Sequence, residues 1–229
     1  MCFSANVSIL TSGILALIGT ISLKKIKTKI QIPLALIPYF FAMQQFSEGI
    51  LWLTLKSNNV YIIGVAKCFT YIYLTFAFFF WPMWIPFSVY MIENEKVRKL
   101  LLRGMLVIGT FVGIYGLFFI IINGGKAQIL DHHILYDVNI PGILSTSFFE
   151  DKGLPISNFY QICYLISVTI PFFISSNRFL WAFGIFAIFS LYITNIFYVK
   201  FMVSIWCFFA ALISIFIYLI IRNYNSTKF

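Results

Sequence analysis

The chain has 229 residues, of which 61% are hydrophobic, 20% aromatic and only 10% charged, and its mean hydropathy is +0.95. A soluble domain has roughly a quarter of its residues charged and under half apolar, so this composition excludes one. The net charge of +9 comes from basic residues in short clusters between apolar runs. That pattern is typical of membrane topology and argues against nucleic acid as a partner.

Seven apolar stretches reach the length of about 20 residues that spans a bilayer core of roughly 30 Å. They cover approximately residues 7–23, 31–55, 60–91, 100–123, 154–175, 179–198 and 201–221. The third is too long for one straight crossing, and Pro82 and Pro86 lie in its second half, so we expect one broken or steeply tilted helix. The predicted fold class is an all-α integral membrane bundle of seven transmembrane helices, forming a single domain over residues 1–229.

The first stretch has no basic residue before it and LKKIKTK after it, which is the reverse of a cleavable signal peptide. We therefore expect the protein to lie in the inner membrane of the cell, with its N-terminus outside and its C-terminus in the cytoplasm. The positive-inside rule agrees, because the expected inner segments hold eleven basic residues and the outer segments four. The inner eleven are Lys24, Lys25, Lys27, Lys29, Lys96, Arg98, Lys99, Arg103, Arg178, Arg222 and Lys228, and the outer four are Lys56, Lys126, Lys152 and Lys200.

The expected outer loop, residues 124–153, is the one sizeable segment outside the apolar stretches, and it contains both histidines. Loops longer than about 12 to 15 residues are usually functional or disordered. His132 and His133 are adjacent and cannot both point the same way, so we expect one to face solvent and at most one to act as a ligand or proton carrier.

Two charged residues, Glu48 and Lys67, lie inside predicted helices, each about seven residues from the outer end. At 1.5 Å per residue both sit roughly 10 Å deep, where charge is costly and normally has a partner. We expect an ion pair between them. It would either serve the site or only fix the register of two helices.

Other polar residues share this depth. Gln45, Glu48 and Trp52 lie on one face of the second helix, with Gln44 beside them. Further polar side chains of the outer half are Ser204 and Cys207 in the last helix, Asn158 and Gln161 in the fifth, Cys2, Ser4 and Asn6 at the N-terminus, and Asp131 and Asp137 in the loop. We expect one site that opens outward, while Ser204, Cys68 and Cys163 taken singly are expected to serve packing.

Six segments resemble an uncharacterised bacterial family of multi-pass membrane proteins: MCFSANVS, LALIPYFFAMQQFSEGILW, FFWPMWIPFSVY, DHHILYDV, ISSNRFLWAFG and FMVSIWCFFAALIS. That family typically begins Met-Cys-Trp/Phe-Ser and carries a His-Gln-x-x-Glu pattern, a Gly-His-His-x-x-Tyr loop and a Trp-Cys pair. The resemblance implies a shared site of Cys2, Ser4, Gln45, Glu48, Trp52, His132, His133, Tyr136, Arg178, Trp206 and Cys207, without naming its chemistry. Here Gln44 stands where the family often has His, and Asp131 where it has Gly, which weakens a metal site that needs the helix-two histidine.

The first functional hypothesis is a membrane-embedded hydrolase or transferase acting on a lipid or lipophilic substrate at the outer leaflet. Its candidate catalytic residues are Cys2, Glu48, His133 and Cys207. Its candidate substrate-binding residues are Ser4, Gln44, Gln45, Trp52, Lys67, Tyr136, Gln161 and Trp206. Zinc or copper is the cofactor that Cys2, His132, His133 and Cys207 could hold.

The second hypothesis is a small-solute or proton-coupled transporter, or a seven-helix ligand sensor. Alternating access needs a second polar layer in the cytoplasmic half, and the sequence offers little there beyond Ser88, Tyr90 and Ser167. Membrane lipids are the expected partners under either hypothesis, and the sequence does not indicate the oligomeric state.

Overall fold

The computed structural model describes residues 4–138, 140 and 155–226. These residues form helices joined by short loops, together with one hairpin, which confirms the predicted all-α class. The helices are α1 (Ala5–Lys25), α2 (Ile32–Ala35), α3 (Ile37–Thr54), α4 (Val60–Thr75), α5 (Trp81–Ile92), α6 (Lys96–Asn123), α7 (Pro155–Ile174), α8 (Arg178–Phe197), α9 (Met202–Ile213) and α10 (Ile217–Ser226). The strands are β1 (Gly125–Leu130) and β2 (His133–Val138).

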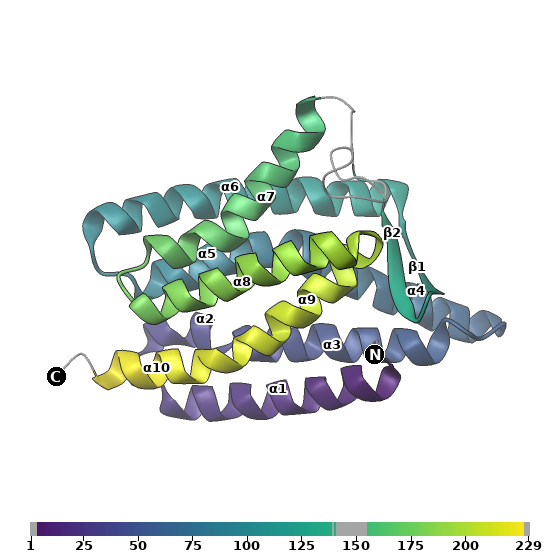
Figure 1. The fold of residues 1–229 in the computed structure, drawn as a ribbon, viewed down its shortest axis with the longest axis horizontal. Coiled ribbons are helices and arrows are strands. Elements are labelled where there is room, and N and C mark those ends of the chain that lie inside the picture. The colour runs from purple at the N-terminus through teal and green to yellow at the C-terminus, as the bar shows by residue number, and fades with distance from the viewer. Residues whose placement is uncertain (1–3, 139, 141–154, 227–229) are drawn as a thin grey trace.

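The long helices lie side by side along the longest axis of the molecule (Figure 1). The start of α1 and the hairpin lie toward one end, on the right of Figure 1. The end of α1, the starts of α6 and α8, and α10 with the C-terminus lie at the opposite end. We call these the hairpin end and the C-terminal end.

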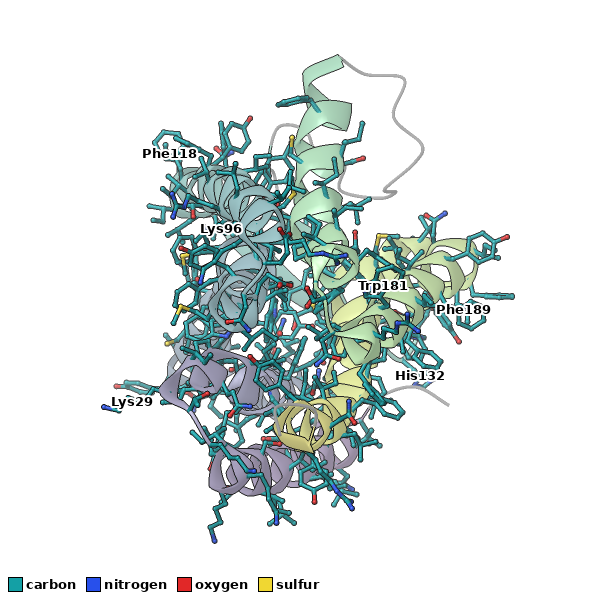
Figure 2. All side chains as sticks on the ribbon, turned by 90° about the vertical axis from the view of Figure 1, so that its left-hand side faces the viewer. Lys29, Lys96, Phe118, His132, Trp181 and Phe189 are labelled. Atoms are coloured by element: carbon teal, nitrogen blue, oxygen red, sulfur yellow. The ribbon has the colours of Figure 1, made fainter. Side chains whose placement is uncertain are left out.

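Five helical segments in the described residues are long and apolar enough to cross a membrane. They are Ala5–Lys25, Val60–Ile92, Lys96–Asn123, Arg178–Phe197 and Val199–Tyr224. Large apolar side chains also cover the outside of the bundle: Phe118 and Phe189 project outward on different sides (Figure 2) and are 54% and 58% exposed. An apolar exterior of this extent suits lipid and not water.

The predicted break in the third apolar stretch is a π-helical segment, Phe76–Phe80, that joins α4 to α5. The N–H of Trp81 donates to the carbonyl oxygen of Phe76, five residues back. The next bond in this register would come from Pro82, which has no N–H. Its acceptor would be the carbonyl oxygen of Ala77, which instead accepts a hydrogen bond of 2.7 Å from the hydroxyl of Tyr164 on α7. The helix therefore continues through the prolines and does not end there.

Glycines on one face of α6 let that helix lie against the π segment and α5. A Cβ atom at Gly109 would lie 1.8 Å from the carbonyl oxygen of Pro82, and one at Gly113 would lie 2.7 Å from that of Phe79. Small residues permit such close backbone approach between membrane helices.

The first part of the predicted outer loop forms the antiparallel hairpin of β1 and β2, in which Leu130 is paired with His133. Asp131 (φ 46°) and His132 (φ 61°) are the two turn residues, both in the left-handed region that a two-residue I′ turn requires. Ile134, Tyr136 and Val138 form the buried face of β2 and pack with residues of α3, α4 and α9. The hairpin thus covers the bundle at its hairpin end.

Candidate functional site

The carboxyl group of Glu48 on α3 is enclosed by the protein, with the residue only 1% exposed. Ser204, on the neighbouring helix α9, donates a hydrogen bond from its hydroxyl to Glu48 Oε1. The side chains of Gln45, one turn earlier on α3, and Tyr136, on β2, also lie beside this carboxyl. Three elements far apart in the sequence therefore meet at one acidic group.

A second set of contacts extends this group toward α5. Gln44 Oε1 accepts a hydrogen bond of 2.8 Å from the indole N–H of Trp81. The Cys207 thiol lies beside the side chains of Gln44 and Tyr73. Tyr73 on α4 stacks on Tyr136, with ring centroids 4.4 Å apart, and its hydroxyl donates to the carbonyl oxygen of Val203 at 3.3 Å. We call Gln44, Gln45, Glu48, Tyr73, Tyr136, Ser204 and Cys207 the Glu48 cluster.

Several polar atoms in and near the cluster have no hydrogen bond of normal geometry within the described residues. They include both side-chain amide atoms of Gln45, the hydroxyl of Tyr136 and the indole nitrogen of Trp52. Buried polar atoms are usually partnered, and leaving one unpartnered costs about 1–3 kcal/mol. These are the atoms in and near the cluster that could make a further hydrogen bond.

Tyr136 is placed to act as a donor in this cluster. Burial, and then the neighbouring Glu48 carboxyl, raises the pKa of Tyr136 well above its ordinary value. Its hydroxyl therefore stays protonated at neutral pH and can donate to a carboxylate or a ligand oxygen.

The expected ion pair between Glu48 and Lys67 is wrong. Lys67 is exposed, and within residues 4–138, 140 and 155–226 no ion pair joins it to Glu48. Ala66, Thr70 and Tyr73 form the buried face of α4, and Lys67 follows Ala66 by about 100° around the helix. Counting residues from the helix end gives the depth of a side chain but not the direction in which it points.

The two histidines point differently, as expected. His132 is exposed at the tip of the hairpin, whereas His133 is buried and stacks on Phe201 with ring centroids 4.5 Å apart. The His133 Nδ1 atom lies 2.7 Å from the carbonyl oxygen of Asp131. Because side chains alternate along a strand, His133 and Tyr136 lie on opposite faces of β2, and His133 is not part of the Glu48 cluster.

The expected metal ligands do not come together in the part of the chain that the structure describes, where no group of three His, Cys, Asp or Glu side chains could hold an ion. His132 lies on the hairpin turn, His133 packs on Phe201, and Cys207 belongs to the Glu48 cluster. Cys2 lies outside the described residues.

The remaining predicted residues make contacts outside the Glu48 cluster. Ser4 is exposed and caps α1 by accepting a hydrogen bond of 3.4 Å from the N–H of Val7. Gln161 is buried in α7, and the indole of Trp206 donates to the carbonyl oxygen of Ala187 at 3.3 Å. Arg178 is exposed as the first residue of α8, at the C-terminal end, far from the hairpin.

Sequence reasoning missed two members of the cluster. Ser204, expected to serve packing, is the hydroxyl donor to Glu48, and its signal was the three-residue spacing to Cys207 at the same depth. Tyr73 was not singled out, although Ala66, Thr70 and Tyr73 repeat at helical spacing.

A narrow, otherwise apolar cavity of about 50 Å³ reaches the cluster at Cys207, between Trp81 and Trp206.

Long apolar helices, an apolar exterior and an enclosed polar cluster together are features of helical membrane proteins. Over residues 1–228 the chain matches the family of unknown function DUF6629, and it belongs to that family. This confirms the resemblance to an uncharacterised family. No curated protein and no solved structure matches the chain.

Proposed function

We propose that the chain crosses the inner membrane of the cell seven times, with its N-terminus outside, and exchanges a proton or a cationic solute at the Glu48 cluster, as a proton-coupled transporter or a ligand sensor does. The charge difference between the two ends supports this topology. The end of α1 and the start of α6, both at the C-terminal end of the bundle (Figure 1), are rich in Lys and Arg, and α8 begins there with Arg178. Positively charged ends normally stay in the cytoplasm.

One observation carries the proposed activity: Glu48 is enclosed among neutral partners, with no cationic side chain paired to it in the described residues. A lone carboxylate in hydrocarbon costs at least about 2.5–3.5 kcal/mol, so the enclosed group needs a positive counterpart. Bound protons and cationic groups of ligands both meet that need. The side-chain amide of Gln45 and the hydroxyl of Tyr136, which lie beside the Glu48 carboxyl, provide polar contacts for such a ligand.

A polar network at the C-terminal end supports transport over catalysis. Glu93, buried after α5, accepts hydrogen bonds of 2.7 and 2.8 Å from the N–H and hydroxyl of Ser176, which precedes α8. Arg98 donates to the carbonyl oxygens of Ile174 and Ser175 at 2.8 and 3.1 Å. A cavity of about 210 Å³ borders this network. These groups lie where α5 and α7 end and α6 and α8 begin, so they form a polar layer at the C-terminal end, on the opposite side of the bundle from the hairpin.

Infrared difference spectroscopy of the purified protein tests the proton-binding carboxyl. We expect the carbonyl band of a buried, protonated carboxyl to change between acidic and alkaline pH, to vanish in Glu48→Gln and to persist in the exposed control Glu95→Gln. The same variants in proteoliposomes test proton flux under an imposed pH gradient. A band unchanged by Glu48→Gln would remove the proposal.

A second candidate is the lipid-active hydrolase or transferase. It is favoured by the hydrogen bond from Ser204 to Glu48, which pairs a hydroxyl nucleophile with a carboxylate base, and by the Cys207 thiol one turn later. A fluorophosphonate probe should then label the protein in membranes and fail to label Ser204→Ala. Absence of labelling in the unmodified protein would count against this candidate.

A further inference from the structure

A large open pocket lies at the hairpin end, between α4 and β1. Its volume is about 620 Å³, within the range of about 300–1,000 Å³ usual for ligand sites. Lys67, Thr70 and Ile63 line it from α4, while Lys126, Gln128 and Asp137 line it from the hairpin. The pocket is separate from the enclosed Glu48 carboxyl, which does not line it.

The charge of this lining favours an anion. Lys67 and Lys126 contribute two positive charges and Asp137 one negative charge. Asp137 stands opposite Lys126 in the hairpin register, so it lies close to one of the two lysines. Lys67 is exposed on the other wall, and within the described residues it has no ion-pair partner.

The position of Lys67 indicates a membrane lipid as the source of that anion. Lys67 is seven residues into the candidate span that begins at Val60, or roughly 10 Å along the helix. A lysine at this depth bends its flexible stem toward the headgroup level. Ile63, which lies one turn before Lys67 in the same pocket, is 51% exposed and offers an apolar surface to an acyl chain.

We propose that this pocket binds the phosphate headgroup of an anionic phospholipid from the outer leaflet, held between Lys67 and Lys126. The inference depends on the proposed topology, which places the hairpin end outside. It is independent of proton exchange at Glu48, because the pocket and the cluster have different linings. The net positive lining attracts an anionic headgroup more strongly than a zwitterionic one.

Lipid-dependent thermal stabilisation of the detergent-solubilised protein tests the site. Phosphatidylglycerol should raise the melting temperature with concentration, and phosphatidylcholine should do so much less, because a ligand that binds only the folded state stabilises it. Lys67→Gln should weaken the apparent affinity for phosphatidylglycerol about fivefold, Lys67→Gln with Lys126→Gln further, and Lys67→Arg little. Lys200→Gln, an exposed lysine outside the pocket, is the matched control.

Three results would overturn the proposal: equal effects of the two lipids, unchanged affinity in Lys67→Gln, or a shift by inorganic phosphate alone that matches phosphatidylglycerol. The last result would identify a site for free phosphate. Glu48→Gln should bind phosphatidylglycerol like the unmodified protein, so failure of this inference and failure of the proposed proton exchange are distinguishable.

Discussion

The close packing of α6 against α5 gives a direct test of the fold around the site. Gly109 is buried, and an added Cβ would lie 1.8 Å from the carbonyl oxygen of Pro82 and 3.3 Å from Cβ of Ser167 on α7. Gly104, five residues earlier on the same helix, has nothing within 4 Å of an added Cβ. Replacing each glycine by alanine therefore adds the same methyl group to a closed and to an open position.

The difference between the two variants isolates the cost of the contact. Alanine favours a helix over glycine by roughly 0.5–1 kcal/mol at both positions, so this term largely cancels. Ordinary contact begins at 3.4 Å, and the obstructing atom at Gly109 is backbone, which cannot rotate away. Overpacking of this kind costs about 1–3 kcal/mol. For a chain of this size each kcal/mol corresponds to about 2–4 °C, so Gly109→Ala should melt roughly 2–12 °C below Gly104→Ala.

Thermal unfolding in detergent, followed by tryptophan fluorescence, measures the difference. Both variants should be expressed in membranes, and Gly104→Ala should melt at or slightly above the unmodified protein. If Gly109→Ala proves as stable as Gly104→Ala, the helices are not packed at this distance and the account of α5, α6 and α7 is wrong.

Two further predictions concern the ends of the bundle. Burial opposes ionisation of Glu93, but hydrogen bonds from Glu95, Ser176 and Asn94 outweigh it and lower the pKa of Glu93. Ionised Glu93 therefore stabilises the fold fully above the pKa that Glu93 has in the unfolded chain, and this contribution is lost as the pH falls through the lower pKa of the folded state. Glu93→Gln should lower the melting temperature at neutral pH and reduce its dependence on pH in the acid range. A melting temperature–pH profile that Glu93→Gln leaves unchanged would contradict the network. His132 has a positive φ in an exposed turn, where glycine avoids a left-handed penalty of about 1–2 kcal/mol but adds about 0.4–1 kcal/mol of unfolded-chain entropy. His132→Gly should therefore not lower, and should slightly raise, the melting temperature in thermal unfolding. It should leave any response to added zinc unchanged, whereas a lost zinc response would restore a metal role for His132.

The sequence predicted which residues lie at the same depth in the membrane, and this shared depth identified several members of the Glu48 cluster. Glu48, Gln45 and Cys207 were grouped by their distance from helix ends, and the structure brings them into one cluster. Lys67 failed the same reasoning because depth does not specify rotation about the helix axis. Rotation depends on which face of α4 packs against α9 and the hairpin, and those are long-range contacts.

The hairpin and the π segment depended on information that a local reading lacks. The turn of the hairpin is Asp131-His132, without the Asn-Gly pair that signals a two-residue hairpin most strongly. The prolines located the irregular part of the third apolar stretch. However, the hydrogen bond that satisfies the carbonyl oxygen of Ala77 comes from Tyr164, 87 residues later, and no local pattern contains it.

The hairpin contacts two different parts of the bundle through Tyr136 and His133, which lie on opposite faces of β2. Tyr136 on one face reaches the Glu48 carboxyl, while His133 on the other rests against Phe201, directly before α9. Because both contacts belong to one two-stranded hairpin, a substitution that changes how His133 packs on Phe201 is expected to shift the Tyr136 hydroxyl relative to the Glu48 carboxyl.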